Sequence, residues 1–140
     1  MSQENDLLIA IRRITRAIDL SSKQLVKSAG LTAPQLLVLQ TLSSGAIRKP
    51  SDIAKDVYLS QATVTSIVDR LTKAGLTRRE KSESDRRVIN VLMTEEGLRV
   101  LDSAPPLLQD NFTKQLKELK AWEQTLLLSS LQRLAEMMDA

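Results

Sequence analysis

Residues 82–97 read SESDRRVINVLMTEEG, and this segment holds the side chains with the clearest chemical use. Arg86 and Arg87 are adjacent, directly follow Asp85 and precede a run of mostly apolar residues. An arginine pair inside a buried strand would carry a large desolvation cost, but at a hairpin tip both guanidinium groups could reach an anionic partner. Asp85 itself repels an anion. We therefore expect its carboxylate to hold an arginine in one geometry through a charge-assisted hydrogen bond.

The composition limits the other chemistry that the chain could perform. There is no cysteine and no histidine, which removes thiol nucleophiles, imidazole bases, disulfides and zinc sites built from these residues. Carboxylates remain, but no close Asp/Glu pair adjoins a segment that predicts an apolar pocket, and no nucleophile–base arrangement is visible. We therefore expect a binding protein that is not an enzyme and that uses neither a metal nor another cofactor.

The charge distribution favours a polyanionic partner. The 140 residues carry a net charge of +3, and this length suits one domain with helical extensions. Residues 44–90 contain ten Lys/Arg and six Asp/Glu, whereas the two flanks together have a net charge of −1. A basic centre of this kind is typical of nucleic-acid binding, although the charge alone slightly favours an ordinary solvated surface.

The N-terminal residues MSQENDLLIA lack the basic stretch before an apolar run that marks a signal peptide. The apolar runs elsewhere are far too short for a membrane span. We expect a cytoplasmic protein with no membrane segment.

Helical periodicity dominates the first fifty residues. An apolar stripe predicts a long helix that ends near Gly30, a typical residue after a helix C-terminus; its members are Leu7, Ile11, Ile14, Ile18 and Leu25. Thr32 and Gln35 fit a capping box at the start of a second helix that stops before Gly45. Residues 47–49 are expected to be extended, because Pro50 disfavours helix in the residue before it.

Two capped segments then follow each other closely, which is the pattern of a helix-turn-helix. Ser51 is expected to cap a helix over 52–57, and Ser60 a helix over 61–74 that Gly75 ends. In this last helix one apolar face is expected in the core, namely Val64, Ile67, Val68 and Leu71. The polar side could lie in a DNA major groove, where it would read base edges, or it could be a plain solvated surface; its candidate contacts are Gln61, Thr63, Thr65, Ser66 and Arg70.

A β-hairpin is expected next, with strands over 76–80 and 88–93 and a polar turn between them. Thr94 is then placed to cap another helix. A helix-turn-helix followed by a basic hairpin is a winged helix, so the fold class is mainly α, or α+β by strict count. Arg86 and Arg87 lie where the hairpin leaves its tip. The wing, with Asp85, Arg86 and Arg87, could therefore carry arginine to the DNA minor groove.

At this point the chain resembles the MarR family of transcriptional regulators. The segment DRRVINVLMTEEG matches that family's wing pattern of Asp-x-Arg, a strand and Leu-x-Thr-x-x-Gly, and LTAPQLLVLQTL and residues 51–80 are further matches. The resemblance implies a winged-helix domain over 32–97 and a helical dimerisation region over 1–31 and 98–140. It also implies a homodimer that binds a palindromic operator in double-stranded DNA, repression of transcription, and release by a small ligand.

The terminal segments support a dimer independently, because their apolar residues exceed what one small domain can cover. Residues 98–119 carry a long apolar track with an expected kink at Pro105 and Pro106, and residues 122–138 are apolar on more than one face. An intramolecular bundle is the alternative.

A small aromatic or anionic effector would need cationic or ring contacts, for which Arg12, Arg16 and Tyr58 are the candidates. Each also has a simple structural explanation, the arginines as a solvated helix face and Tyr58 as a packing residue in the turn. The alternative function, from a different class, is a winged-helix module that binds protein and never contacts DNA.

Overall fold

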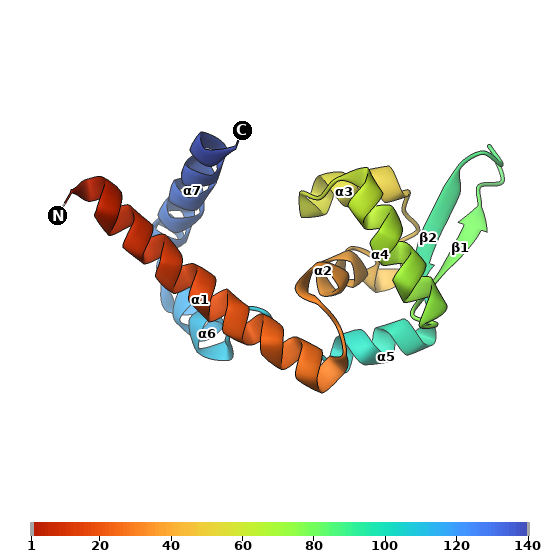
Figure 1. Ribbon diagram of the computed structural model, residues 1–140, viewed down its shortest axis with the longest axis horizontal. Coiled ribbons are helices and arrows are strands. Elements are labelled where there is room, and N and C mark those ends of the chain that lie inside the picture. The colour runs from red at the N-terminus through yellow and green to blue at the C-terminus, as the bar shows by residue number, and fades with distance from the viewer. Residues whose placement is uncertain (1, 140) are drawn as a thin grey trace. The chain divides into compact units, whose positions relative to one another are not determined.

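Local capping explains where most helices of this chain begin. The computed structural model describes residues 2–139 and contains nine elements besides one short 3₁₀ turn, η1 (Figure 1). They are α1 (Gln3–Ala29), α2 (Ala33–Thr41), η1 (Ser43–Gly45), α3 (Pro50–Val57), α4 (Gln61–Lys73), β1 (Thr77–Lys81), β2 (Ile89–Met93), α5 (Glu95–Ser103), α6 (Asp110–Glu118) and α7 (Ala121–Met138). The chain forms two compact units, and the boundary between them in the sequence lies between Leu107 and Leu108.

The predicted caps at Thr32, Ser60 and Thr94 are confirmed. The Thr32 side chain and Gln35 form the reciprocal capping box of α2, with N–H to oxygen distances of 3.0 and 3.3 Å. Ser60 Oγ accepts from the Thr63 N–H at 3.1 Å, and Thr94 Oγ1 accepts from the Gly97 N–H at 3.1 Å. Each bond satisfies an N–H that the first turn of a helix leaves without an intrahelical partner.

One start was predicted wrongly. Helix α3 begins at Pro50 with Lys49 as the N-cap residue, not at Asp52 with Ser51 as the cap, and no side chain caps it. Proline at the first helical position needs no N–H partner and already has the helical φ, so the helix starts two residues earlier than predicted.

The winged-helix core lies among α2, α3, α4 and the sheet. The four predicted core residues of α4, Val64, Ile67, Val68 and Leu71, are buried. They join a cluster supplied by the other elements of this unit, which includes Leu25, Leu36, Val38, Leu39, Leu42, Ile53, Leu76 and Val91. This cluster fixes the orientation of α4 and leaves its opposite face in solvent.

The wing is an antiparallel hairpin of β1 and β2, in which Thr77 pairs with Met93 and Lys81 with Ile89. Arg48 adds one bridge on the other edge of β2, because its N–H and carbonyl exchange hydrogen bonds with Val91 at 3.0 and 2.8 Å. This bridge confirms the extended segment predicted before Pro50.

Thr94 and Gly97 join the wing to α4. The Thr94 hydroxyl donates to the Gly75 carbonyl at 2.6 Å, and the Thr94 N–H donates to the Leu76 carbonyl at 3.1 Å. A Cβ atom on Gly97 would lie 2.1 Å from the Leu76 carbonyl oxygen. The approach of α5 to the end of α4 therefore requires glycine at this position.

Substituting Gly97 with alanine should destabilise this unit. The contact is to backbone, so α5 would have to shift, and overpacking of this kind costs about 1–3 kcal/mol. We expect a clear drop in the free energy of unfolding measured in urea. Asp102→Ala, an exposed substitution near the other end of the same helix, should change it by less than about 0.5 kcal/mol. Equal stability of the two variants would contradict the account of this junction.

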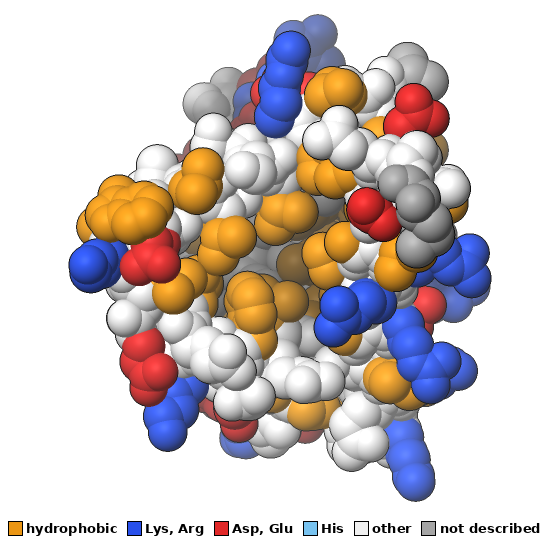
Figure 2. Space-filling view, turned by 90° about the vertical axis from the view of Figure 1, so that its left-hand side faces the viewer, with side chains coloured by type: hydrophobic (Ala, Val, Ile, Leu, Met, Phe, Trp, Pro, Cys, Tyr) orange, Lys and Arg blue, Asp and Glu red, His pale blue; other side chains and the backbone are white. Residues whose placement is uncertain are grey.

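The long helices bury little within the single chain. Leu25 is the one buried residue of α1, and among the described residues neither α6 nor α7 has a buried side chain. Large apolar side chains such as Ile14, Trp122 and Leu128 are consequently exposed, and hydrophobic groups gather at the surface in Figure 2.

The two prolines at 105 and 106 do more than kink a helix. Helix α5 ends at Ser103 and α6 begins at Asp110, so the apolar track of 98–119 is divided between two helices. Proline lacks the N–H that would continue a helix. Within residues 2–139, no helix is both long and apolar enough to cross a membrane.

Candidate nucleic-acid interface

The exposed face of α4 is presented by the turn that follows α3. Tyr58 ends α3 in the left-handed conformation, with φ of 56°, and the Leu59 N–H donates to the Ala54 carbonyl at 3.1 Å. Ser60 then caps α4 directly. This tight connection allows α3 and α4 to share one core while the polar face of the N-terminal half of α4 remains exposed.

The five predicted residues of α4 are all exposed, but the structure distributes them over three places. Thr63, Ser66 and Arg70 line a groove between α4 and the start of α2. Thr65 lies on the other side of the helix, in a hollow facing the wing, and Gln61 lies beside the α3–α4 turn. Side chains about one turn apart share a face, so Ser66 and Arg70 form one continuous polar strip.

Thr63 is partly committed to holding the helix. Its hydroxyl accepts a hydrogen bond from Ser60 Oγ at 2.8 Å, in addition to the bond from its N–H to the same oxygen. This arrangement stabilises the first turn of α4.

At the tip of the wing, Asp85 holds Arg87 as the sequence predicted. The carboxylate accepts from the Arg87 N–H at 3.0 Å, from Nε at 3.2 Å and from a terminal guanidinium nitrogen at 3.4 Å. The Arg87 side chain is nevertheless 91% exposed. The guanidinium group is thus oriented by its neighbour and still open to an anionic partner. Arg86 is exposed in the same turn.

Hydrogen bonds from the Arg87 side chain, and secondarily from its backbone N–H, lower the pKa of Asp85 below the ordinary 3.8. Because the pKa of Asp85 is lowered in the folded protein, this interaction stabilises the loop fully when the pH is above the ordinary pKa of 3.8. The stabilisation is lost as the pH falls through the lowered pKa of the folded protein. Carboxyl chemical shifts followed by NMR should give an Asp85 midpoint below 3.8. Arg87→Ala should raise that midpoint. An unchanged midpoint would show that the arginine does not hold the carboxylate in solution.

Two ion pairs that no local sequence pattern indicates involve the helices of the helix-turn-helix, one from the segment before α3 and one from the wing. Arg48 pairs with Asp56 of α3 at 2.5 Å, and Arg79 of β1 pairs with Asp69 of α4. Each pair joins residues that the chain separates by eight or ten positions. The proximity of Arg79 and Asp69 depends on how the hairpin packs against α4, which no local pattern reveals.

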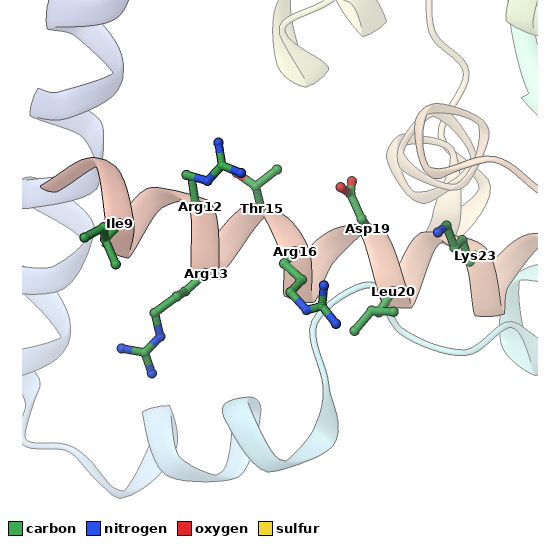
Figure 3. Close-up of a pocket in the computed structure, with 8 residues that line it drawn as sticks. All are labelled: Ile9, Arg12, Arg13, Thr15, Arg16, Asp19, Leu20 and Lys23. Atoms are coloured by element: carbon green, nitrogen blue, oxygen red, sulfur yellow. The ribbon is translucent and has the colours of Figure 1, made fainter. Parts of the chain in front are cut away.

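The effector candidates are not gathered in one place. Arg12 and Arg16 line a depression of about 630 Å³ along α1, together with Arg13, Asp19 and Lys23. In Figure 3, Arg13 and Leu20 extend from one side of the helix and Arg12, Thr15 and Asp19 from the opposite side. Tyr58 lies elsewhere, in a hollow with Lys55 and Gln61 beside the α3–α4 turn. The α1 side chains therefore offer positive charge without enclosing a ligand.

Comparison with known proteins points to transcriptional regulators. A sequence profile described as the MarR family matches residues 31–89. The organic hydroperoxide resistance transcriptional regulator of Bacillus subtilis is 28% identical over 133 residues, covering 91% of this chain and 90% of that protein. The chain spans about three fifths of the length of several other curated relatives, which are described as transcriptional regulators or repressors.

Solved structures with the same fold include proteins bound to DNA and to a small molecule. The transcriptional repressor CouR, bound to a 23-mer DNA duplex, is 28% identical with a TM-score of 0.71, over 90% of this chain and 89% of that one. The PcaV regulator of Streptomyces coelicolor, in complex with its natural ligand, is 26% identical with a TM-score of 0.72, over 93% and 92%. The winged-helix prediction is confirmed.

Proposed function

Because the chain belongs to the MarR family of transcriptional regulators, we propose that it is a homodimeric, sequence-specific DNA-binding repressor that a small ligand releases. It acts in the cytoplasm on a palindromic operator. The observation that carries this proposal is the pairing of an exposed, polar α4 face with a wing arginine that is oriented by Asp85 and 91% exposed. These are the two elements that a winged helix uses to reach adjacent grooves.

The dimer is supported by the apolar residues that the single chain leaves exposed. Helix α7 exposes Trp122, Leu126, Leu127, Leu128 and Leu131, each by 46% or more. Contiguous apolar surface of this kind is characteristic of obligate interfaces. We propose that residues 1–31 and 98–140 together form the dimerisation region and that two α4 helices then face successive major grooves.

Release by a ligand is supported by the basic residues that line the depression along α1 and by the ligand-bound PcaV structure. Arg12 and Arg16 would pair with the charge of a small aromatic or anionic effector. Both arginines lie on the surface of a single helix, which cannot enclose an effector. Other segments must therefore supply the remaining walls of the effector pocket.

Replacing Arg87 with alanine should weaken operator binding by about 1–3 kcal/mol, by analogy with direct base contacts. The slope of log affinity against log salt should become shallower by roughly 0.9 for each phosphate-like interaction that the substitution removes, and both subunits contribute. Thermal stability should hardly change. Fluorescence anisotropy across a salt series measures both quantities.

Asp85→Ala is the matched control for that experiment. It leaves Arg87 in place without its orienting carboxylate, so a smaller affinity loss and no shallower slope are expected. Tighter binding by Asp85→Ala would show that Asp85 only repels DNA. If Arg87→Ala changes neither quantity, Arg86 takes its place as the candidate wing contact.

A mobility-shift assay with the DNA upstream of the protein's own gene tests the function. We expect a retarded complex that survives excess non-specific competitor. Failure to bind any duplex above the non-specific level would favour a protein-interaction module instead.

A further inference from the structure

One ion pair joins α4, the proposed recognition helix, to the wing at a distance from the wing's base. The Arg79 guanidinium donates to Asp69 Oδ1, from β1 to α4. Arg79 lies opposite Val91 in the hairpin, two residues from the buried Thr77 and hence on the same face of the sheet. The two side chains are 39% and 50% exposed, so the pair lies at the surface between the helix and the wing.

The base of the wing is held differently, by short-range hydrogen bonds. The hydroxyls of Thr72 and Thr77 lie 2.9 Å apart, and Thr94 binds the Gly75 carbonyl. Thr72, Gly75 and Thr77 lie where α4 ends and β1 begins, and Thr94 directly follows β2. These hydrogen bonds fix the root of the hairpin and leave its far half to other interactions.

Beyond the root, a hollow of about 250 Å³ lies between the helix and the wing, and the buried core residues Val68 and Val91 form part of its lining. Thr65 and Val68 of α4 line one wall, Ile89 and Val91 of β2 line another, and Asp69 and Arg79 border it. Ile89 is 44% exposed. Apolar packing between the helix and the wing is complete at Val68 and Val91 but not at Ile89, and the ion pair adds a contact from α4 to β1 at the border of the hollow.

We propose that the Asp69–Arg79 pair is a brace that fixes the angle of the wing relative to the recognition helix. Both are positioning residues, because they set where Arg86 and Arg87 lie when α4 enters the major groove. The inference rests on the proposed function, in which both elements contact one duplex. Holding the two elements in place before binding reduces the conformational freedom lost on association.

The direction in which one substitution changes DNA affinity distinguishes this brace from a simple effect of charge. Asp69 places a negative charge on the exposed side of the DNA-reading helix, so charge alone predicts that Asp69→Asn tightens binding to any DNA. The brace predicts the opposite for the operator. Loss of an exposed pair corresponds to about a two- to five-fold weakening for each subunit, while binding to non-specific DNA is unchanged or tighter.

Fluorescence anisotropy on the operator and on a scrambled duplex tests this with four variants: Asp69→Asn, Arg79→Gln, their combination, and the charge swap Asp69→Arg with Arg79→Asp. The combined variant should bind the operator no worse than Arg79→Gln alone, because both variants remove the same ion pair. The charge swap should recover part of the specificity. If Asp69→Asn binds the operator as tightly as the unaltered protein, or more tightly, the brace is wrong.

A distance measurement tests the brace without DNA. The chain has no cysteine, so spin labels can be placed at Glu83→Cys in the wing turn and Lys73→Cys at the end of α4. Labelled chains diluted with unlabelled ones limit the signal to pairs within one subunit. Double electron–electron resonance should give a narrow distance distribution that Asp69→Asn broadens.

If the distance distribution is equally wide in the unaltered protein and in Asp69→Asn, the brace is wrong, whatever the DNA-binding measurements show. If the unaltered protein has no preference for the operator but the distribution still broadens, the proposed function fails and the brace stands as a structural contact.

Discussion

Replacing Ser66 with glutamate is expected to abolish specific operator binding. Ser66 is exposed on α4 and lines the groove with Thr63 and Arg70, so the new carboxylate would face the DNA at the centre of the proposed contact. Like charges forced together at an interface cost several kcal/mol, which corresponds to about a hundred-fold loss of affinity or more.

The fold should tolerate this change. Glutamate has a higher helix propensity than serine, and a surface substitution of this kind alters stability by about 0.5 kcal/mol or less. Circular dichroism and thermal unfolding should therefore match the unaltered protein.

Two controls separate charge from shape and from net charge. Ser66→Gln adds similar bulk without charge and should retain more affinity. Gln40→Glu adds the same charge on an exposed position at the far end of α2 from the groove and should bind nearly normally. Normal operator binding by Ser66→Glu would show that this side of α4 does not read DNA.

Placing lysines at Leu127 and Leu131 is expected to convert the proposed dimer into a monomer. The two residues are one helical turn apart on α7 and are 46% and 51% exposed in the single chain. Their replacement removes apolar surface that the proposed dimer would cover. The two side chains are exposed in the single chain, so the secondary structure should persist. Sedimentation equilibrium should report half the mass.

Operator affinity should fall when dimerisation is lost. A two-fold protein binds the second half-site at high effective concentration, and that advantage is about 10²–10⁴ in affinity. Gln132→Lys adds charge to an exposed polar position of the same helix and is the control for charge alone. Deleting residues 122–140 should have the same or a larger effect, with aggregation. A lysine variant that stays dimeric with full affinity would place the interface elsewhere.

Features governed by local chemistry were predictable from the sequence. Thr32, Ser60 and Thr94 each precede a helix whose first N–H groups need an acceptor, and all three caps form. The same reasoning failed at Ser51, because Pro50 can begin a helix without any cap. The Asp85–Arg87 contact was also predictable, since residues two apart in a tight turn lie within reach of each other.

Features that depend on how elements pack were not predictable. Asp69 looked like one more exposed residue of α4, and its partner Arg79 became apparent only once the hairpin was placed along that helix. The sequence likewise grouped Tyr58 with Arg12 and Arg16 by chemical type, whereas in the structure Tyr58 lines a different hollow from the two arginines. Leu7, Ile14 and Ile18 were recognisable as a stripe, but the single chain leaves them exposed.

Selection from a pool of randomised DNA duplexes tests the central claim most directly. A dimer that places one recognition helix in each of two successive major grooves should enrich an inverted repeat whose half-sites are centred about 10 base pairs apart. Footprinting of the enriched duplex should protect both halves equally. Enrichment of no sequence, or of a single half-site bound with full affinity, would contradict the account of this protein as a dimeric, sequence-specific DNA-binding regulator.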